Sequence, residues 1–262
     1  TDIHGLAHYG EEGVLVMTSD STNSHSPGFT KTEKAVGPTF ERIFSTSTGR
    51  VIMSTFSSNI HRVAQAIEKA LKHGRKICVI GRSMEKNLDI AMTLGYIKFP
   101  KDQFIEAHEI NKYTDKEVMI VTTGSQGESM SALYRMAIHE HRHVKIKPED
   151  QIILSAKAIP GNEGSVSQII NHLLKAGAKV AYQDYTDIHV SGHAAQEEQK
   201  LMLRLVKPKF FLPVHGEYNH ALKHGETGVD CGVLERNVYV MADGEQIEVN
   251  PKYLKKVKTV KS

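Results

Sequence analysis

Short apolar runs alternate with longer amphipathic stretches along most of the chain. The apolar runs predict strands at residues 14–17, 51–55, 76–80, 118–122, 151–154, 179–181 and 210–214. The amphipathic stretches predict helices at residues 60–73, 84–94, 130–139, 166–176 and 196–206. Strands and helices that alternate at this spacing are typical of largely parallel sheets with helices packed on their faces. The predicted fold class is therefore α/β.

Turn residues sharpen the predicted boundaries. Gly74, Gly95 and Gly177 directly follow three of the predicted helices, at the position where a left-handed cap is favoured. Pro208 prevents the helix at 196–206 from continuing. Near the end of the chain, Asp243-Gly244 separates residues 238–241 from residues 247–249, and Asp-Gly favours a tight turn with positive φ. These residues predict a β-hairpin.

The composition describes an ordinary globular protein. The chain has 262 residues, of which 40% are hydrophobic and 24% charged. It contains no run of roughly 20 apolar residues and no signal-peptide pattern, so no membrane partner is expected. Cys78 and Cys231 are the two cysteines, too few for a disulfide framework, which favours a cytoplasmic location. Because the chain begins with Thr1, we expect it to be a piece of a larger protein.

Charge gives only a weak indication of a partner. The net charge is +3, which does not by itself predict nucleic-acid binding. Lysines gather after Glu248, at positions 252, 255, 256, 258 and 261. They could form an arm that contacts phosphates, but a solvated basic linker over residues 251–262 is the favoured prediction.

Several predicted strands run directly into small polar loops. These loops are Phe56-Ser57-Ser58-Asn59, Gly81-Arg82-Ser83, Thr123-Gly124-Ser125-Gln126-Gly127-Glu128 and Ile159-Pro160-Gly161-Asn162-Glu163. Ligands of parallel α/β sheets bind outside the carboxyl ends of the strands, and each loop also opens a helix whose free amides favour an anion. Any one loop is explained by turn and capping preferences alone. Together they predict a phosphate-bearing ligand, although none matches a P-loop or a dinucleotide-binding motif.

Two histidines mark the densest candidate chemistry. His193 follows Ser191-Gly192 just before the helix predicted at 196–206, and His215 follows the strand predicted at 210–214. Histidines at strand ends commonly serve as metal ligands or acid–base groups. Core or capping roles remain an equal alternative on these residues alone. The run His139-Glu140-His141-Arg142-His143 lies at a predicted helix end, where cationic side chains complement the dipole, and no metal role is expected there.

At these residues the sequence resembles the β-CASP branch of the metallo-β-lactamase-fold nucleases, and within it the ribonuclease J family. The resemblance is carried, in the family's order, by Ser19-Asp20-Ser21-Thr22-Asn23, Phe56-Ser57-Ser58-Asn59, Gly81-Arg82-Ser83-Met84, Thr123-Gly124-Ser125-Gln126-Gly127-Glu128, Ile159-Pro160-Gly161-Asn162-Glu163, His189-Val190-Ser191-Gly192-His193 and Pro213-Val214-His215-Gly216-Glu217. The motifs are spread from about residue 14 to residue 217. The resemblance therefore depends on their joint order and not on any single motif.

The resemblance implies roles for individual residues. It makes Asp20, His193 and His215 the expected catalytic residues. His215 is the expected zinc ligand, His193 is expected to contact the scissile phosphate, and Asp20 is expected to orient His193. The expected substrate contacts are Ser57, Ser58, Asn59, His189, Val190, Ser191, Gly192 and His193.

The implied activity is zinc-dependent hydrolysis of RNA phosphodiesters. It combines 5′-to-3′ exonuclease action on 5′-monophosphate ends with endonuclease cleavage, in rRNA processing and mRNA decay. Two zinc ions would clamp the reacting oxygens. RNA is the expected partner, together with a homo-oligomer (dimer or tetramer) and an RNA helicase or the ribosome.

The resemblance also implies an architecture and a gap. Residues 34–185 are expected to form a β-CASP domain inserted in a partial metallo-β-lactamase-like αββα domain, whose parts are residues 1–33 and 186–250. The family's main zinc cluster, His-x-His-x-Asp-His, should precede Asp20, where nothing matches. A zinc site needs three or four protein ligands, and this chain supplies one expected ligand. We therefore expect the chain alone to be inactive.

Two alternatives to an active nuclease stay open. The chain could be a non-catalytic module that holds RNA or a 5′-phosphate. It could also be an unrelated α/β hydrolase or phosphate-sugar enzyme with similar serine-rich loops. The last alternative leaves the Asp20 segment and the spacing of His193 and His215 unexplained.

Overall fold

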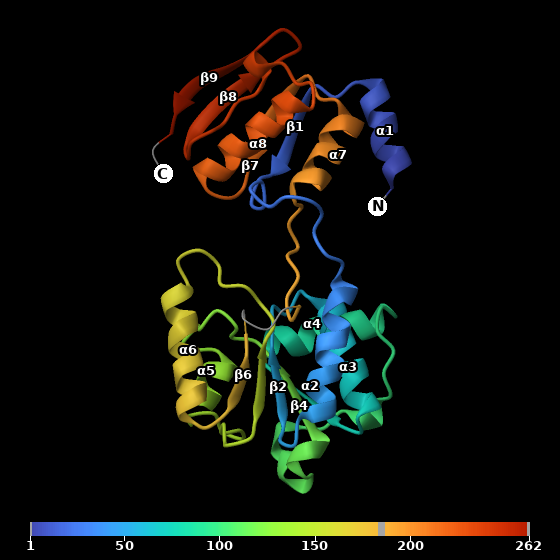
Figure 1. Cartoon of the computed structure of the whole chain (residues 1–262), viewed down its shortest axis with the longest axis vertical. Helices are drawn as coiled ribbons and strands as arrows, with labels where there is room; N and C mark the ends of the chain where they lie inside the picture. The colour runs from blue at the N-terminus through green and yellow to red at the C-terminus, as the bar shows by residue number, and fades with distance from the viewer. Residues whose placement is uncertain (1, 183–186, 261–262) are drawn as a thin grey trace. The chain divides into compact units, whose positions relative to one another are not determined.

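A computed structural model describes residues 2–182 and 187–260 of the chain, which form two compact units (Figure 1). Unit 1 comprises residues 1–31 and 191–262, and unit 2 comprises residues 32–190. Unit 2 is therefore continuous in sequence and interrupts unit 1. In the described part of the chain, no helix has the length and apolar character needed to cross a bilayer.

Unit 2 is built on a five-stranded parallel sheet in the order β3-β4-β2-β5-β6. Its strands are β2 (Val51–Ser54), β3 (Lys76–Ile80), β4 (Val118–Thr122), β5 (Gln151–Leu154) and β6 (Lys179–Ala181). Its helices are α2 (Gly37–Thr46), α3 (Ile60–Lys72), α4 (Arg82–Thr93), α5 (Ala132–Ala137) and α6 (Glu163–Lys175). Short 3₁₀ turns occur at Glu33–Val36, Lys101–Gln103, Ala107–Lys112 and Asp115–Glu117.

The helices of unit 2 cover both faces of its sheet (Figure 1). Successive residues of a strand point to opposite faces, so Met53 of β2 packs in the core with α2, α3 and α4, whereas its neighbour Ile52 packs in the core with α5 and α6. All five residues of β4 are buried. A strand buried on both faces needs a continuous apolar run, which explains why such runs predict these strands.

Unit 1 is smaller and centres on two parallel strands, β1 (Val16–Asp20) and β7 (Phe210–Val214). The other elements are α1 (Ile3–Glu12), α7 (Gln196–Val206), α8 (Tyr218–Asp230), a 3₁₀ turn at Glu235–Asn237, β8 (Glu245–Val249) and β9 (Leu254–Thr259). Phe211 is fully buried, and a Cβ at Gly228 of α8 would lie 2.7 Å from its ring. Gly228 therefore lets α8 pack directly against β7.

The α/β prediction is confirmed, and each of the seven strands predicted between residues 14 and 214 overlaps an observed one. The helix predicted at 130–139 is shorter, because the Ser131 side chain caps its start and His139 adopts a positive φ of 64° at its end. Helices α1, α2 and α8 lie outside the predicted helical ranges. Helix α1 contains Gly5 and Gly10, α2 begins with Gly37-Pro38, and α8 contains Gly225 and Gly228, residue types that weaken a helical pattern.

The predicted C-terminal hairpin and linker are wrong. Strand β8 pairs antiparallel with β9, which lies inside the expected linker at 251–262. The Asn250 side chain accepts hydrogen bonds from the amides of Lys252 and Tyr253, so the chain reverses there and not at Asp243-Gly244. The segment expected to pair with 247–249 lies beside β7 instead, where the Tyr239 amide donates to the Phe211 carbonyl at 3.0 Å.

Candidate active site

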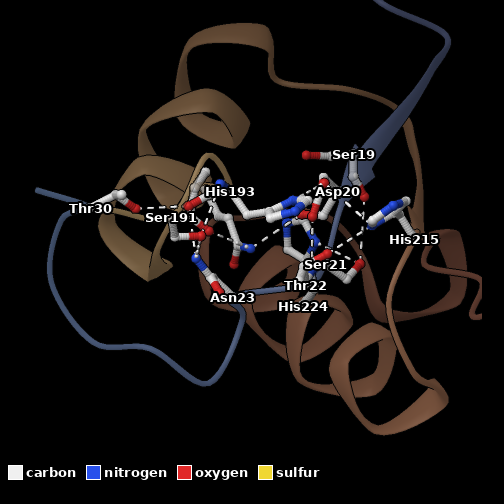
Figure 2. Close-up of polar contacts among 12 residues, drawn as sticks. Ser19, Asp20, Ser21, Thr22, Asn23, Thr30, Ser191, His193, His215 and His224 are labelled. Carbon is white, nitrogen blue, oxygen red and sulfur yellow. Dashed lines mark hydrogen bonds and ion pairs between the residues drawn. The ribbon is translucent and has the colours of Figure 1, made fainter. Parts of the chain in front are cut away.

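The candidate site lies where β1 and β7 end (Figure 2). Asp20, the last residue of β1, is in register with Val214, the last residue of β7, so His215 follows directly beside Asp20. His193 comes from the segment that leads into α7 and reaches the same place. The structure thus brings together the three predicted catalytic residues, although 173 positions separate Asp20 from His193.

Asp20 contacts both histidines of this group. Its Oδ1 accepts the Thr22 amide at 2.8 Å, and its Oδ2 accepts His193 Nδ1 at 2.7 Å. Burial acts to raise the pKa of Asp20, but hydrogen bonds from the Thr22 amide and His193 outweigh it, and the pKa lies below 3.8. The ionised carboxylate can only accept, so the hydrogen-bond network assigns a hydrogen to His193 Nδ1. His193 Nε2 is then left for a substrate oxygen.

His215 is held in an unusual backbone conformation. Its φ is 60°, in the left-handed region that non-glycine residues rarely adopt. A 2.7 Å hydrogen bond joins its Nδ1 to Thr22 Oγ1, and its Nδ1 lies 3.5 Å from Asp20 Oδ2. Its ring stacks on that of His193, with centroids 5.3 Å apart. Backbone strain of this kind concentrates at functional sites.

The loop after β1 fixes the backbone of His193. Asn23 Nδ2 donates to the His193 carbonyl at 2.8 Å and to Ser191 Oγ at 2.9 Å, and Thr30 Oγ1 donates to the same carbonyl at 2.8 Å. Ser191 Oγ also accepts the His193 amide at 3.1 Å. Asn23 lies inside a motif that carries the resemblance but had no predicted role, and Thr30 was missed altogether because nothing in its sequence surroundings marks it.

A buried histidine of α8 also contacts the loop after β1. His224 of α8 is fully buried, and a 3.1 Å hydrogen bond joins its Nδ1 to Ser21 Oγ, next to Asp20 (Figure 2). Its Nε2 has no hydrogen-bond partner among the described residues. Burial lowers the pKa of His224 to about 4, against a partial opposing effect of Asp20. His224 is therefore neutral at pH 7, and no motif in the sequence marks this residue.

This neutral histidine predicts a pH-dependent stability. In the unfolded chain His224 has its ordinary pKa near 6.5, and in the folded chain its pKa is about 4. Below pH 6.5 the unfolded state binds the additional proton, so His224 by itself should lower the free energy of unfolding by about 3 kcal/mol between pH 6.5 and pH 4. Urea unfolding across this range checks it. His224→Gln should remove most of that loss, and equal pH dependence in both proteins would contradict the assignment.

The predicted substrate contacts do not all lie in one unit. Ser191, Gly192 and His193 belong to unit 1, whereas the other predicted contacts belong to unit 2. Residues Ser57, Ser58 and Asn59 form the loop between β2 and α3, where Ser57 Oγ accepts Asn87 Nδ2 at 3.1 Å. His189 Nδ1 accepts a hydrogen bond from Arg62 at 2.7 Å, and Val190 is buried.

Asp20, His193 and His215 also fit a metal ion. One ligand atom from each residue lies within 4.8 Å of the others. Two imidazole nitrogens and one carboxylate oxygen suit zinc, and three protein ligands are the number found in catalytic zinc sites. The geometry therefore offers two candidate ligands in addition to His215.

Comparisons with known families agree with the motif pattern. Residues 48–173 match the family described as ribonuclease J, β-CASP domain. Residues 177–240 match the Zn-dependent metallo-hydrolase RNA specificity domain. The two matches follow one another along the chain, in the region that contains most of the quoted motifs.

Individual relatives support the same family. The chain is 66% identical over all of its 262 residues to ribonuclease J of Helicobacter pylori, and it covers 38% of that protein. It is 48% identical over 244 residues, or 93% of its length, to ribonuclease J 1 of Streptococcus pyogenes, of which it covers 44%. It is 43% identical over 95% of its length to ribonuclease J of Synechocystis, of which it covers 39%. The chain thus spans less than half the length of these relatives, and over that span it is similar to ribonuclease J proteins.

Proposed function

We propose that this chain forms part of a zinc-dependent ribonuclease that hydrolyses RNA phosphodiesters. The observation that carries the proposal is the 2.7 Å hydrogen bond from His193 Nδ1 to Asp20, with His215 stacked beside it at the strand ends. In this arrangement Asp20 orients the imidazole, and the doubly protonated His193 ring contacts the scissile phosphate through Nε2–H. It gives that proton to the leaving oxygen and becomes the neutral ring, with Nδ1–H still on Asp20. His215 would hold zinc, with Asp20 close enough to add a carboxylate ligand.

The remaining parts of the proposal follow from the family and the loops. A bound zinc ion would supply Lewis-acid polarisation of the phosphate. The loop Ser57-Ser58-Asn59 and the segment 189–193 bind the substrate strand. The activity combines 5′-to-3′ exonuclease action on 5′-monophosphate ends with endonuclease cleavage, in cytoplasmic rRNA processing and mRNA decay. The partners include further copies of the same protein and an RNA helicase or the ribosome.

The domain assignment belongs to the same proposal. Residues 34–185 correspond to the β-CASP domain, and residues 1–33 and 186–250 correspond to parts of a metallo-β-lactamase-like domain. The second proposed boundary falls at residues 183–186, outside the described residues. The two compact units change over at 31/32 and 190/191.

The experiment compares this chain with the full-length protein that contains it. Each is incubated with zinc or manganese and 5′-monophosphorylated, labelled RNA. The full-length protein should release nucleotides from the 5′ end, and its His193→Ala variant should not. His108→Ala changes an exposed histidine of unit 2 and serves as the matched control. A full-length protein that leaves the RNA intact with either metal would contradict the proposal.

A second candidate function, a non-catalytic RNA-binding module, applies to the 262-residue chain by itself. The observation in its favour is that its described residues contain one group of potential metal ligands, with three members. This chain should bind the labelled RNA without cutting it, and His193→Ala should weaken the binding. Cleavage by this chain at the full-length rate would show that its metal centre is complete.

A further inference from the structure

Arg62 is a fully buried arginine on α3, outside the catalytic group. A guanidinium has five N–H donors, and each of those of Arg62 has an acceptor. Nε and Nη2 donate to the Glu33 carboxylate at 3.1 and 2.5 Å. Nη1 donates to the Ser155 carbonyl at 3.0 Å and to His189 Nδ1 at 2.7 Å, and Nη2 also donates to the Val190 carbonyl at 2.9 Å.

This saturation distinguishes Arg62 from a charge buried by chance. A buried charge is tolerated only when it is paired and its donors are satisfied. Lysine would keep the charge, but its ammonium is a point charge with three donors and cannot reproduce the planar fork. The acceptors around Arg62 therefore specify arginine.

The acceptors have a common location in the chain. Glu33 lies two residues after the first change of unit, at 31/32, and His189 and Val190 directly precede the second, at 190/191. One side chain thus holds both strands of polypeptide where they enter and leave unit 2. Gln65, one turn further along α3, donates to the Glu33 carbonyl at 3.0 Å and reinforces the first connection.

The second connection is tied at three consecutive residues. Ser155 Oγ donates to the Ile188 carbonyl, and Arg62 holds His189 and Val190. Ile188 and Val190 are also buried in the core of unit 2. From Val190 the chain reaches His193 in three residues, which span about 10 Å when fully extended. Backbone motion at residues 188–190 therefore begins only three residues before His193.

The state of His189 fits this arrangement. Burial, followed by the positive charge of Arg62, lowers the pKa of His189 to about 4. A hydrogen bond with the Ser155 backbone and the charge of Glu33 act to raise this pKa, whereas the charge of Lys157 acts to lower it further. The ring is consequently neutral at pH 7 and can accept from Arg62.

We propose that Arg62 is a positioning residue of the nuclease, which holds both connecting segments where they enter and leave unit 2 and so anchors the start of the segment 189–193. The inference rests on the proposed ribonuclease function. Under this proposal α3 links two predicted substrate-binding segments. It follows the loop Ser57-Ser58-Asn59 directly, and its Arg62 holds the start of the segment 189–193.

The test compares Arg62→Lys with Arg75→Lys in the full-length protein. Arg75 is the matched control, because it is also buried and donates to backbone carbonyls, of Ser47, Gly49 and Val118, which lie away from both connections. Both variants are assayed at a temperature where each is fully folded. Arg62→Lys should lower kcat for RNA hydrolysis about tenfold with KM changed less than kcat. Arg75→Lys should keep kcat near that of the wild type.

Hydrogen exchange gives a readout that does not depend on activity. Amides of residues 187–195 should exchange about tenfold faster in Arg62→Lys than in the wild type or in Arg75→Lys. Glu33→Gln, which keeps an acceptor oxygen for Arg62, should show a smaller change in the same direction and serves if Arg62→Lys does not fold. Equal kcat in Arg62→Lys and Arg75→Lys, or unchanged exchange at 187–195, would overturn the positioning role. An inactive wild-type protein would instead overturn the ribonuclease proposal.

Discussion

Replacing Asp20 by asparagine is expected to lower kcat for RNA hydrolysis by about 10³-fold in the full-length protein. The substitution preserves size, and the Asn oxygen can still accept the Thr22 amide that Asp20 Oδ1 accepts now. The amide nitrogen, however, would face His193 Nδ1, which donates to Asp20 Oδ2 at 2.7 Å. Two donors cannot share that contact, so the imidazole must change its tautomer or turn away, as in hydrolases whose orienting aspartate is replaced.

The measurement is single-turnover cleavage of labelled RNA at saturating enzyme and metal. Asp230→Asn is a matched control, because Asp230 is an exposed carboxylate at the end of α8 in the same unit. The control should cleave at the wild-type rate. If Asp20→Asn cleaved within about threefold of the wild type, a 10²- to 10⁴-fold acid–base contribution from the Asp20–His193 pair would be excluded.

Replacing Asp150 by alanine is expected to destabilise unit 2 by about 3–5 kcal/mol. Asp150 is fully buried and accepts two hydrogen bonds from Arg50, at 2.8 and 2.5 Å, and one from the Lys147 amide at 3.0 Å. Removal of the carboxylate leaves the Arg50 guanidinium, itself 4% exposed, without its counter-charge. An unpaired charge in the interior is costly, which makes this single substitution among the most damaging in the unit.

Chemical unfolding of the two variants Asp150→Ala and Asp115→Ala checks this expectation. Asp115 forms a 2.6 Å ion pair with Lys147, but both side chains are 45% exposed. Because solvent screens exposed pairs, its loss should cost at most about 1 kcal/mol. Similar losses in both variants would mean that burial of the Arg50–Asp150 pair has no bearing on its contribution.

The secondary structure could be predicted where burial imposes a simple pattern. The central strands β2 and β4 of unit 2 are buried on both faces, so their apolar runs stand out from the helices around them. Strand β9 has the opposite character, since most of its residues are exposed and it is rich in lysine. It is held by pairing with β8 and by ion pairs such as Lys256 with Glu245, at 2.5 Å. Because burial does not hold this strand, its sequence has no apolar run from which the strand could be predicted.

The convergence of Asp20, His193 and His215 could be predicted from the sequence, whereas the residues that support them could not. Asp20 and His215 lie in short motifs at strand ends, and His193 lies in a short motif just before α7. These motifs identify the three residues one by one. Thr30, His224 and Arg62 act through partners 163, 203 and 127 positions away. Threonine, histidine and arginine occur on ordinary surfaces as well, so their neighbours in sequence carry no sign of these contacts.

The interruption of unit 1 by unit 2 has a consequence for the protein as it is made on the ribosome. Asp20 emerges 173 residues before His193, and at about 5–20 residues per second it waits roughly 10–35 s for that partner. Strand β1, whose one pairing partner in the described chain is β7, waits longer still. Unit 2 has all of its strands in one continuous stretch and can fold during that interval. The edge of β1 that pairs with β7 thus stays open throughout the synthesis of unit 2, and this is the period in which that edge is most exposed to misassociation.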